Sequence, residues 1–172
     1  MKSAYNIFRH QLVSLANYFR GRQFKMLTNE FFNSFIGIYR PYIKRTQPIL
    51  DQFGLHTGQW LVLKDIATYD QTTLVQISKR RFIEKPTARK IIKVLFEKDL
   101  LLVTPGTDKR EKLLSLSEKG QQLFENINAC ITPIQEDLIH QSNISNDDLD
   151  HVIAIMKKLH TTLSKGDTHE SD

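Results

Sequence analysis

The sequence predicts a mainly α-helical protein that carries one small β-hairpin. Over most of the 172 residues, apolar side chains recur every three or four positions, which is typical of amphipathic helices. Near the middle, two short apolar segments flank Pro105-Gly106 and place alternate side chains on opposite faces, which indicates two strands joined by a turn. Hydrophobic residues make up 40% of the chain, enough for the core of one domain with helical appendages.

Residues 1–27 are predicted to form a basic N-terminal arm or helix. The first 29 residues contain five cations and no carboxylate, and the remaining 19 cations equal the 19 carboxylates of the chain. The body of the protein is therefore neutral, and the excess charge belongs to the arm. Met26 is an alternative translation start that would remove residues 1–25. If the arm is present, we expect an extra dimer clasp, with binding to an anionic membrane surface as the alternative.

A long dimerisation helix is predicted for residues 28–56. Thr28 can cap its start, and apolar side chains return at each turn along one side. Pro41 and Pro48 lie inside this helix. Each proline removes a backbone donor, so we expect a kink or a break near one of them. Gly54 is expected to end the helix.

Residues 57–116 are predicted to form a compact core. Its first helix spans about residues 57–68. Thr73 and Gln76 have the spacing of a capping box, which starts a second, short helix. A turn around residues 82–85 leads into a third helix.

The third helix of the core is predicted to have one buried side and one cationic side. Its first turn contains Pro86, which is tolerated there because the missing N–H would have no partner anyway. Apolar residues, among them Ala88 and Leu95, share one side. At 100° per residue the other side carries Pro86, Arg89, Lys90 and Lys93. Two short helices joined by a tight turn form a helix-turn-helix.

Charge is segregated along the chain. Residues 79–93 hold seven cations and one Glu, for a net charge of +6, whereas residues 118–172 carry a net charge of −6. A basic face on a neutral body suggests an anionic polymer as the partner.

The hairpin after the helix-turn-helix is predicted to be a wing, and long helices follow it. Ser117 can cap one of them, and Ser145 with Asp148 can cap the other, so residues 117–163 are expected to be helical. The polar residues 164–172 are expected to be a disordered tail. The long flanking helices cannot all be buried on a small core, so we expect them to pack against a second copy in a homodimer.

This arrangement resembles the MarR family of bacterial winged-helix transcription regulators, over about residues 28–163. The matching motifs are Gly54-Leu55, Gln59-Trp60, Thr73 through Ser78, Asp108-Lys109-Arg110, and Leu116-Ser117-Glu118-Lys119-Gly120. The resemblance implies a winged helix-turn-helix regulator, a repressor, that acts as a homodimer on a pseudo-palindromic operator. Asp99 stands where the family usually has Gly, and we expect Asp to tolerate the left-handed conformation there.

The candidate DNA contacts lie on the helix-turn-helix and the wing. Arg and Lys can reach guanine O6 and N7 in the major groove, so the recognition-helix candidates are Thr87, Arg89, Lys90 and Lys93. Thr73, Lys85 and Pro86 are candidates at the start and turn of the motif. By resemblance, Arg110 enters the minor groove and Asp108 orients it through an ion pair. Lys109 and Lys112 would then contact phosphates.

The resemblance also implies a small effector, phenolic or otherwise aromatic, in a crevice between the dimer helices and the winged helix. Candidate lining residues are Phe31, Phe35, Tyr39 and Trp60. Aromatic residues at helical spacing are also typical of a core, which is the alternative interpretation.

Other classes of protein lack support in the sequence. The single Cys130 excludes an intrachain disulfide, and we expect it to be buried and inert. The six histidines include no pair at i, i+4, and no phosphate loop or nucleophile motif occurs, so neither metal, cofactor nor enzyme activity is expected. With no apolar run of membrane-spanning length, we expect a cytoplasmic protein. A winged helix that binds a protein partner, or a regulator held at a membrane surface by the arm, is the alternative.

Overall fold

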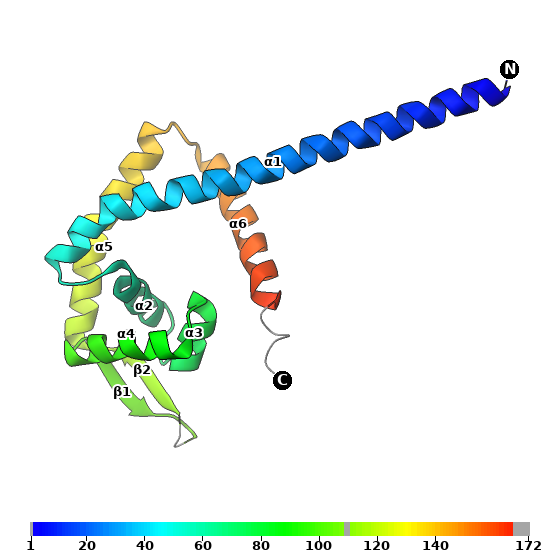
Figure 1. The fold of residues 1–172 in the computed structure, drawn as a ribbon. Helices are drawn as coiled ribbons and strands as arrows, with labels where there is room; N and C mark the ends of the chain where they lie inside the picture. Colours follow the sequence, from blue (N-terminus) through cyan, green and yellow to red (C-terminus); the bar gives the residue numbers. More distant parts are fainter. Residues whose placement is uncertain (1, 109–110, 167–172) are drawn as a thin grey trace. The chain divides into compact units, whose positions relative to one another are not determined.

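The computed structural model describes residues 2–108 and 111–166 (Figure 1). The chain divides into two units, Met1–Thr46 and Gln47–Asp172. Within the described residues the helices are α1 (Lys2–Gln52), α2 (Thr57–Thr68), α3 (Leu74–Arg81), α4 (Lys85–Glu97), α5 (Glu118–Gln141) and α6 (Asn146–Gly166). The strands are β1 (Leu101–Pro105) and β2 (Lys112–Leu116). The predicted fold class, mainly α with a small hairpin, is confirmed.

Helix α1 is longer and more regular than the sequence predicts. It runs without interruption through Pro41 and Pro48, so a break at either proline is a wrong prediction. Each proline removes one backbone donor, and the helix is nevertheless continuous from Lys2 to Gln52. Thr28 does not cap a helix. It lies inside α1, where its hydroxyl donates to the carbonyl of Phe24 at 2.8 Å, so the expected helix start at this residue is wrong.

The C-terminal end of α1 is closed by Gly54, as predicted. This glycine has a φ of +65°, a left-handed conformation in which a side chain would be strained. Its N–H donates to the carbonyl of Asp51 at 3.0 Å, and the N–H of Leu55 donates to the carbonyl of Leu50 at 2.9 Å. These two bonds turn the chain sharply towards α2.

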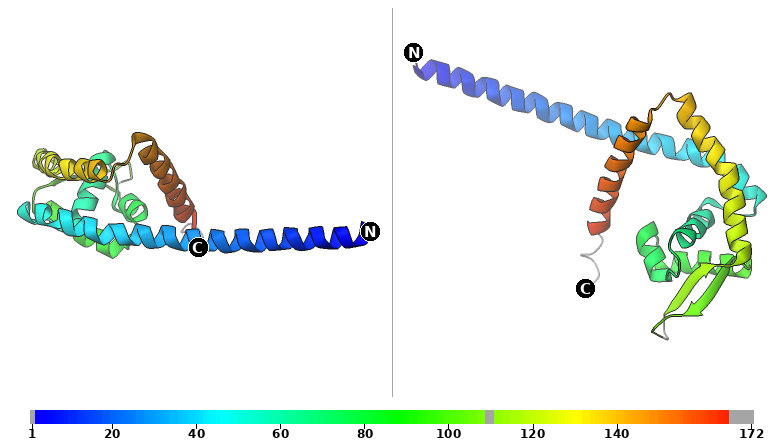
Figure 2. Two further views of the ribbon diagram at one scale, coloured as in Figure 1. Left: turned by 90° about the horizontal axis from the view of Figure 1, so that it is seen from above. Right: turned by 180° about the vertical axis from the view of Figure 1, so that it is seen from behind.

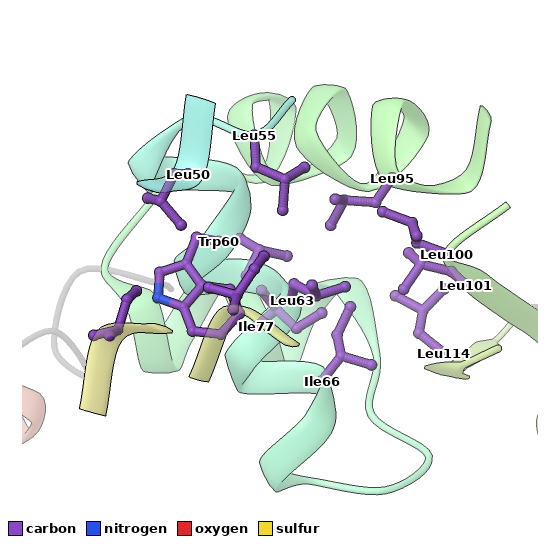
Figure 3. Packing of buried hydrophobic residues seen from close by; sticks show 13 residues of the cluster. Leu50, Leu55, Trp60, Leu63, Ile66, Ile77, Leu95, Leu100, Leu101 and Leu114 are labelled. Atoms are coloured by element: carbon purple, nitrogen blue, oxygen red, sulfur yellow. The ribbon is translucent and has the colours of Figure 1, made fainter. Parts of the chain in front are cut away.

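The core of the C-terminal unit gathers side chains from α2, α3, α4, α5 and both strands (Figure 3). Trp60 is only 6% exposed and stacks on Phe124 of α5, with 5.6 Å between ring centroids. The other buried apolar members are Leu50, Leu55, Val62, Leu63, Ile66, Ile77, Leu95, Leu100, Leu101, Leu114, Ile127 and Ile131. The helix-turn-helix is therefore built on one continuous apolar core.

The hairpin is antiparallel, and its register pairs Leu101 with Leu116 and Pro105 with Lys112. A third segment joins it: Thr72, just before α3, forms an isolated antiparallel bridge with Leu114 of β2. The N–H of Thr72 donates to the carbonyl of Leu114 at 3.0 Å, and the N–H of Leu114 donates back at 2.7 Å. The base of the wing is thus bonded to the segment that starts α3.

Helices α5 and α6 follow the hairpin in sequence (Figure 2). The hydroxyl of Ser117 accepts from the N–H of Gly120 at 2.9 Å, which confirms the predicted cap of α5. Ser145 and Asp148 form the predicted capping box of α6: the Asp148 carboxylate accepts from the Ser145 N–H at 3.2 Å, and the Ser145 hydroxyl accepts from the Asp148 N–H at 3.2 Å.

Two expectations for this part of the chain are wrong. Cys130 is exposed on α5 rather than buried, because it lies beside the apolar stripe and not in it. Helix α6 continues to Gly166, with the hydroxyl of Ser164 donating to the carbonyl of His160, so the expected tail does not start at residue 164. Residues 167–172 lie outside the described part of the chain. Among the described residues, no helix is both long enough and apolar enough to span a bilayer.

Candidate DNA-binding surface

The start of α3 is held by the predicted capping box. The hydroxyl of Thr73 accepts from the N–H of Gln76 at 3.2 Å, and the side chain of Gln76 accepts from the N–H of Thr73 at 2.9 Å. Thr73 is only 5% exposed. Its side chain is thus used inside the domain, and this burial does not support the direct DNA contact predicted for it.

The turn between α3 and α4 is tight because Phe82 adopts a left-handed conformation, with a φ of +51°. The N–H of Ile83 then donates to the carbonyl of Ser78 at 3.1 Å, and the hydroxyl of Ser78 donates to the carbonyl of Ile83. Helix α4 begins directly afterwards with Pro86 in its first turn, as expected. The geometry of the helix-turn-helix is therefore set by backbone bonds and one buried serine.

Helix α4 presents its cations to solvent. Ala88 and Leu95 are fully buried, and they orient the helix on the core. The opposite side exposes the predicted contact residues Lys85, Pro86, Thr87, Arg89, Lys90 and Lys93. Lys93 lies 3.6 Å from Glu97, one turn on, but both side chains are so exposed that this ion pair holds Lys93 only weakly. The cationic face is available to a large anionic partner.

The wing carries two of its predicted contact residues in the described part of the chain. Asp108 and Lys112 are both exposed. The turn is closed by the N–H of Gly106, which donates to the carbonyl of Glu111, and by the N–H of Glu111, which donates to the carbonyl of Asp108, each at 2.8 Å. Lys109 and Arg110 lie outside the described residues, so the predicted ion pair between Asp108 and Arg110 stays a prediction.

A groove of about 950 Å³ separates α3 and α4 from the wing. Arg89, Lys93 and Lys112 line it together with the carboxylates of Asp108 and Glu111. Apolar side chains form the floor: Leu74, Val75, Ile92, Phe96, Val103 and Leu114. The groove joins the recognition helix to the wing in one concave surface, a relationship that periodicity alone does not predict.

The sequence pattern misassigns one cation of the basic segment. Arg80 belongs to the run that predicts an anionic partner, but its guanidinium forms an ion pair with Asp65 of α2, with 2.6 Å between Nη2 and Oδ2. It also lies over the ring of Tyr69, 4.0 Å from the centroid. Asp65 lies fifteen positions earlier, and no local spacing connects the two residues.

The candidate effector residues fall in different units. Phe31, Phe35 and Tyr39 lie on the part of α1 that belongs to the N-terminal unit, where Phe31 packs edge-on against Phe32 with 5.3 Å between centroids. Phe35 and Tyr39 are about half exposed, at 50% and 52%. Trp60 belongs to the core of the C-terminal unit. Over residues 2–108 and 111–166, no group of three or more His, Cys, Asp or Glu side chains is placed to hold a metal ion.

A helix-turn-helix with an exposed cationic second helix, and with a wing bonded to the segment just before its first helix, defines the class of winged helix-turn-helix DNA-binding proteins. No family model matches the sequence. An HTH-type transcriptional regulator of Staphylococcus aureus is 48% identical over 141 residues, which cover 81% of this chain and 97% of that relative.

Solved structures agree with this class. Staphylococcus aureus MarR in complex with salicylate and kanamycin is 48% identical; the match covers 83% of this chain and 96% of that chain, with a TM-score of 0.74. A cysteine-to-serine mutant of Escherichia coli MarR complexed with operator DNA has the same fold, at 17% identity and a TM-score of 0.65 over 76% of this chain and 93% of that one. The chain belongs to the MarR family of transcriptional regulators, which are not enzymes.

Proposed function

We propose that this protein is a sequence-specific repressor that binds double-stranded DNA as a homodimer on a pseudo-palindromic operator. One observation carries the proposal. The cationic face of α4 and the wing belong to one packed unit, and backbone bonds between Thr72 and Leu114 tie the wing to the start of α3. In Figure 1 the hairpin extends from the side of the unit on which α4 lies. A helix and a wing held in this way can enter two adjacent grooves of DNA.

The major groove of B-DNA is the proposed site of α4. It is wide enough to admit a helix, and the exposed side chains of Arg89, Lys90 and Lys93 have the donors that recognise guanine O6 and N7. Thr87, Lys85 and Pro86 lie at the start of α4, where a helix commonly approaches the phosphate backbone. On the wing, Lys112 and Lys109 are the proposed phosphate contacts, and Arg110, oriented by Asp108, is the proposed minor-groove contact.

The proposed dimer would cover exposed apolar side chains on α1 and α6. On α1, Phe24, Ile36 and Ile38 are 73%, 61% and 69% exposed, and on α6 Val152 and Ile155 are about half exposed. Exposed apolar surface on this scale marks an interaction site. A two-fold dimer carries two recognition helices, so its operator has two half-sites about one helical turn apart. A dimer seated on such a site would exclude RNA polymerase, which is the proposed basis of repression.

We further propose that a small aromatic acid modulates DNA binding. Staphylococcus aureus MarR, 48% identical, was solved with salicylate and kanamycin. On α1, the exposed Phe35 and Tyr39 and the half-buried Phe31 supply flat apolar surface for a phenolic ring. Trp60 is already covered by the core, so we place the ligand contacts on α1 first.

Fluorescence anisotropy tests the proposed DNA binding. The full chain is titrated onto a labelled duplex from the region upstream of its own gene, and onto a scrambled duplex of equal length, at several salt concentrations. We expect tighter binding to the upstream duplex, with log affinity falling by about 0.9 per phosphate contact for each unit of log salt. Lys93→Ala should weaken binding to the upstream duplex and reduce its preference over the scrambled duplex, since the lysine is proposed to contact a base.

Lys157→Ala on α6 is the matched control, because it removes another exposed lysine that lies outside the helix-turn-helix. It should leave both affinity and slope unchanged. Equal affinity for the upstream and scrambled duplexes would favour a protein-binding winged helix instead. Salicylate should release the upstream duplex, and Tyr39→Ala should raise the salicylate concentration that is required. Liposome binding that depends on residues 1–25 would instead favour the membrane-surface alternative.

A further inference from the structure

Arg80 lies in the basic segment of the helix-turn-helix but points into the protein. Its Nε donates to both carboxylate oxygens of Asp65, at 3.2 and 3.1 Å, and its Nη2 donates to Oδ2 at 2.6 Å. The Asp65 side chain is 5% exposed and that of Arg80 is 26% exposed. A carboxylate buried to this degree needs a paired cation, so the ion pair holds the Arg80 side chain of α3 against Asp65 of α2.

Thr72 extends this ion pair to the wing. Its hydroxyl accepts from Nη2 of Arg80 at 2.6 Å and donates to Oε1 of Gln76 at 3.1 Å. Its main chain forms both hydrogen bonds of the bridge to Leu114 on β2. Thr72 is only 2% exposed. One buried threonine therefore connects the guanidinium of α3, the capping box of the same helix and the base of the wing.

Tyr69 closes the outer side of the cluster. Its ring lies 4.0 Å from the Arg80 guanidinium carbon, so the cation is covered on one face by the ring while its donors face Asp65 and Thr72. The planar guanidinium can form two parallel bonds to the carboxylate and still reach the threonine hydroxyl, which a lysine ammonium cannot reproduce.

We propose that Arg80 is a positioning residue for DNA binding, which with Asp65 and Thr72 sets the place of the wing relative to α3 and α4. Its charge does not contact DNA. The cluster makes the recognition helix and the wing act as one rigid surface, so that phosphate contacts by the wing depend on it. This inference rests on the proposed DNA-binding function.

The variant Asp65→Asn separates positioning from charge, because the two ideas predict opposite signs. Loss of a carboxylate makes the protein more positive, so simple electrostatics predicts tighter binding to any DNA. If Asp65 positions the wing through Arg80, binding to a duplex selected by the parent protein from a randomised pool should weaken about five- to tenfold. Affinity for a scrambled duplex should stay equal or rise. Tighter binding of Asp65→Asn to the selected duplex would overturn the proposal.

Coupling to the wing gives the second readout. In the parent, Lys112→Ala should weaken binding about three- to fivefold through a lost phosphate contact. In an Arg80→Met background the same change should cost less than about twofold, because a displaced wing has already lost that contact. Lys79→Met is the matched control, since it removes an exposed cation from the same helix. The loss of binding free energy in Lys79→Met should add to the loss in Lys112→Ala. If the losses in Arg80→Met and Lys112→Ala are also additive, the positioning role is refuted.

Circular dichroism and thermal melting of each variant establish that it is folded at the assay temperature. If Asp65→Asn or Arg80→Met is unfolded, Thr72→Val takes its place, because it replaces the hydroxyl with a methyl group of similar size and leaves the backbone bridge to Leu114. Thr72→Val should show the same loss of coupling to Lys112→Ala, and additivity would refute the proposal. If the parent itself selects no duplex from the pool, the proposed DNA-binding function is wrong. If the parent selects a duplex but the effects of the two substitutions are additive, only the positioning role of Arg80 is wrong.

Discussion

Gly120, in the first turn of α5, lies against the carbonyl of Leu100, so close that a β-carbon on residue 120 would stand 2.1 Å from that oxygen. Two bonds reinforce this approach. The N–H of Ser117 donates to the same Leu100 carbonyl at 3.1 Å, and the hydroxyl of Ser117 donates to the carbonyl of Asp99 at 2.6 Å. The start of β1 is therefore clamped to the start of α5, and the Leu-Ser-Glu-Lys-Gly motif has a structural reason.

Replacement of Gly120 should destabilise the contact between the start of β1 and the start of α5. Gly120→Ala must push the Leu100 carbonyl away, and overpacking of a well-packed site costs about 1–3 kcal/mol, with more where backbone must move. We expect a lower midpoint in urea denaturation and an unchanged slope. Gly21→Ala is the control, because the residue is helical and a β-carbon there meets nothing within 4 Å. Its free energy of unfolding should rise by up to about 1 kcal/mol. An equal loss of stability in both variants would contradict a close contact between Gly120 and Leu100.

Trp60 should behave as a core residue. Because it is 6% exposed and stacked on Phe124, Trp60→Ala is expected to lower the free energy of unfolding by about 3–5 kcal/mol. Leu102→Ala, which truncates a 52% exposed side chain of the wing, should stay within about 0.5 kcal/mol of the parent. Chemical denaturation measures both. A stable Trp60→Ala variant that loses salicylate binding would instead assign Trp60 to the ligand site.

Ile38 should lie in the dimer interface. Ile38→Glu places a charge on a side chain that is 69% exposed in the single chain, so the fold should survive while dimerisation weakens about a hundredfold or more. Analytical ultracentrifugation gives the dissociation constant. Lys44→Glu, an exposed position on another side of the same helix, is the control and should remain dimeric. Persistence of the dimer in Ile38→Glu would place the interface elsewhere.

The capping box of α6 should make its N-terminus sensitive to acid. The hydroxyl of Ser145, and then its N–H, hold the pKa of Asp148 below the ordinary 3.8. Because the folded pKa is depressed, the contribution to helix stability is fully present above 3.8 and is lost as pH falls through the folded pKa.

Carboxyl NMR titration measures this directly. Ser145→Ala should raise the pKa of Asp148 towards 3.8, since it removes the larger of the two causes. The protection of first-turn amides of α6 against hydrogen exchange, relative to the intrinsic exchange rate at the same pH, should fall below that pH in the parent but not in Asp148→Asn. An unchanged Asp148 pKa in Ser145→Ala would show that the hydroxyl bond is not formed in solution.

Local patterns were sufficient wherever a feature depends on neighbours in the chain. The capping boxes at Thr73 and Ser145, the helix end at Gly54 and the cationic side of α4 were all predicted from spacing. Asp99 also adopts the expected left-handed conformation, with a φ of +61°. Thr28 was misread because an isolated threonine before a carboxylate is an equally good cap signal whether the helix starts there or runs through it.

The sequence by itself determined the fold class, the faces of the helices and the family resemblance, because side-chain periodicity and capping are properties of a few consecutive residues. Only the tertiary structure decided which cations face solvent and which form ion pairs inside the protein. Arg80 and Lys93 read alike in the sequence, yet one pairs with buried Asp65 and the other is exposed on α4. The contact of Gly120 with Leu100 was likewise decided by the tertiary structure. Like the ion pair of Arg80 with Asp65, it joins residues that are distant in the chain and that the folded core brings together.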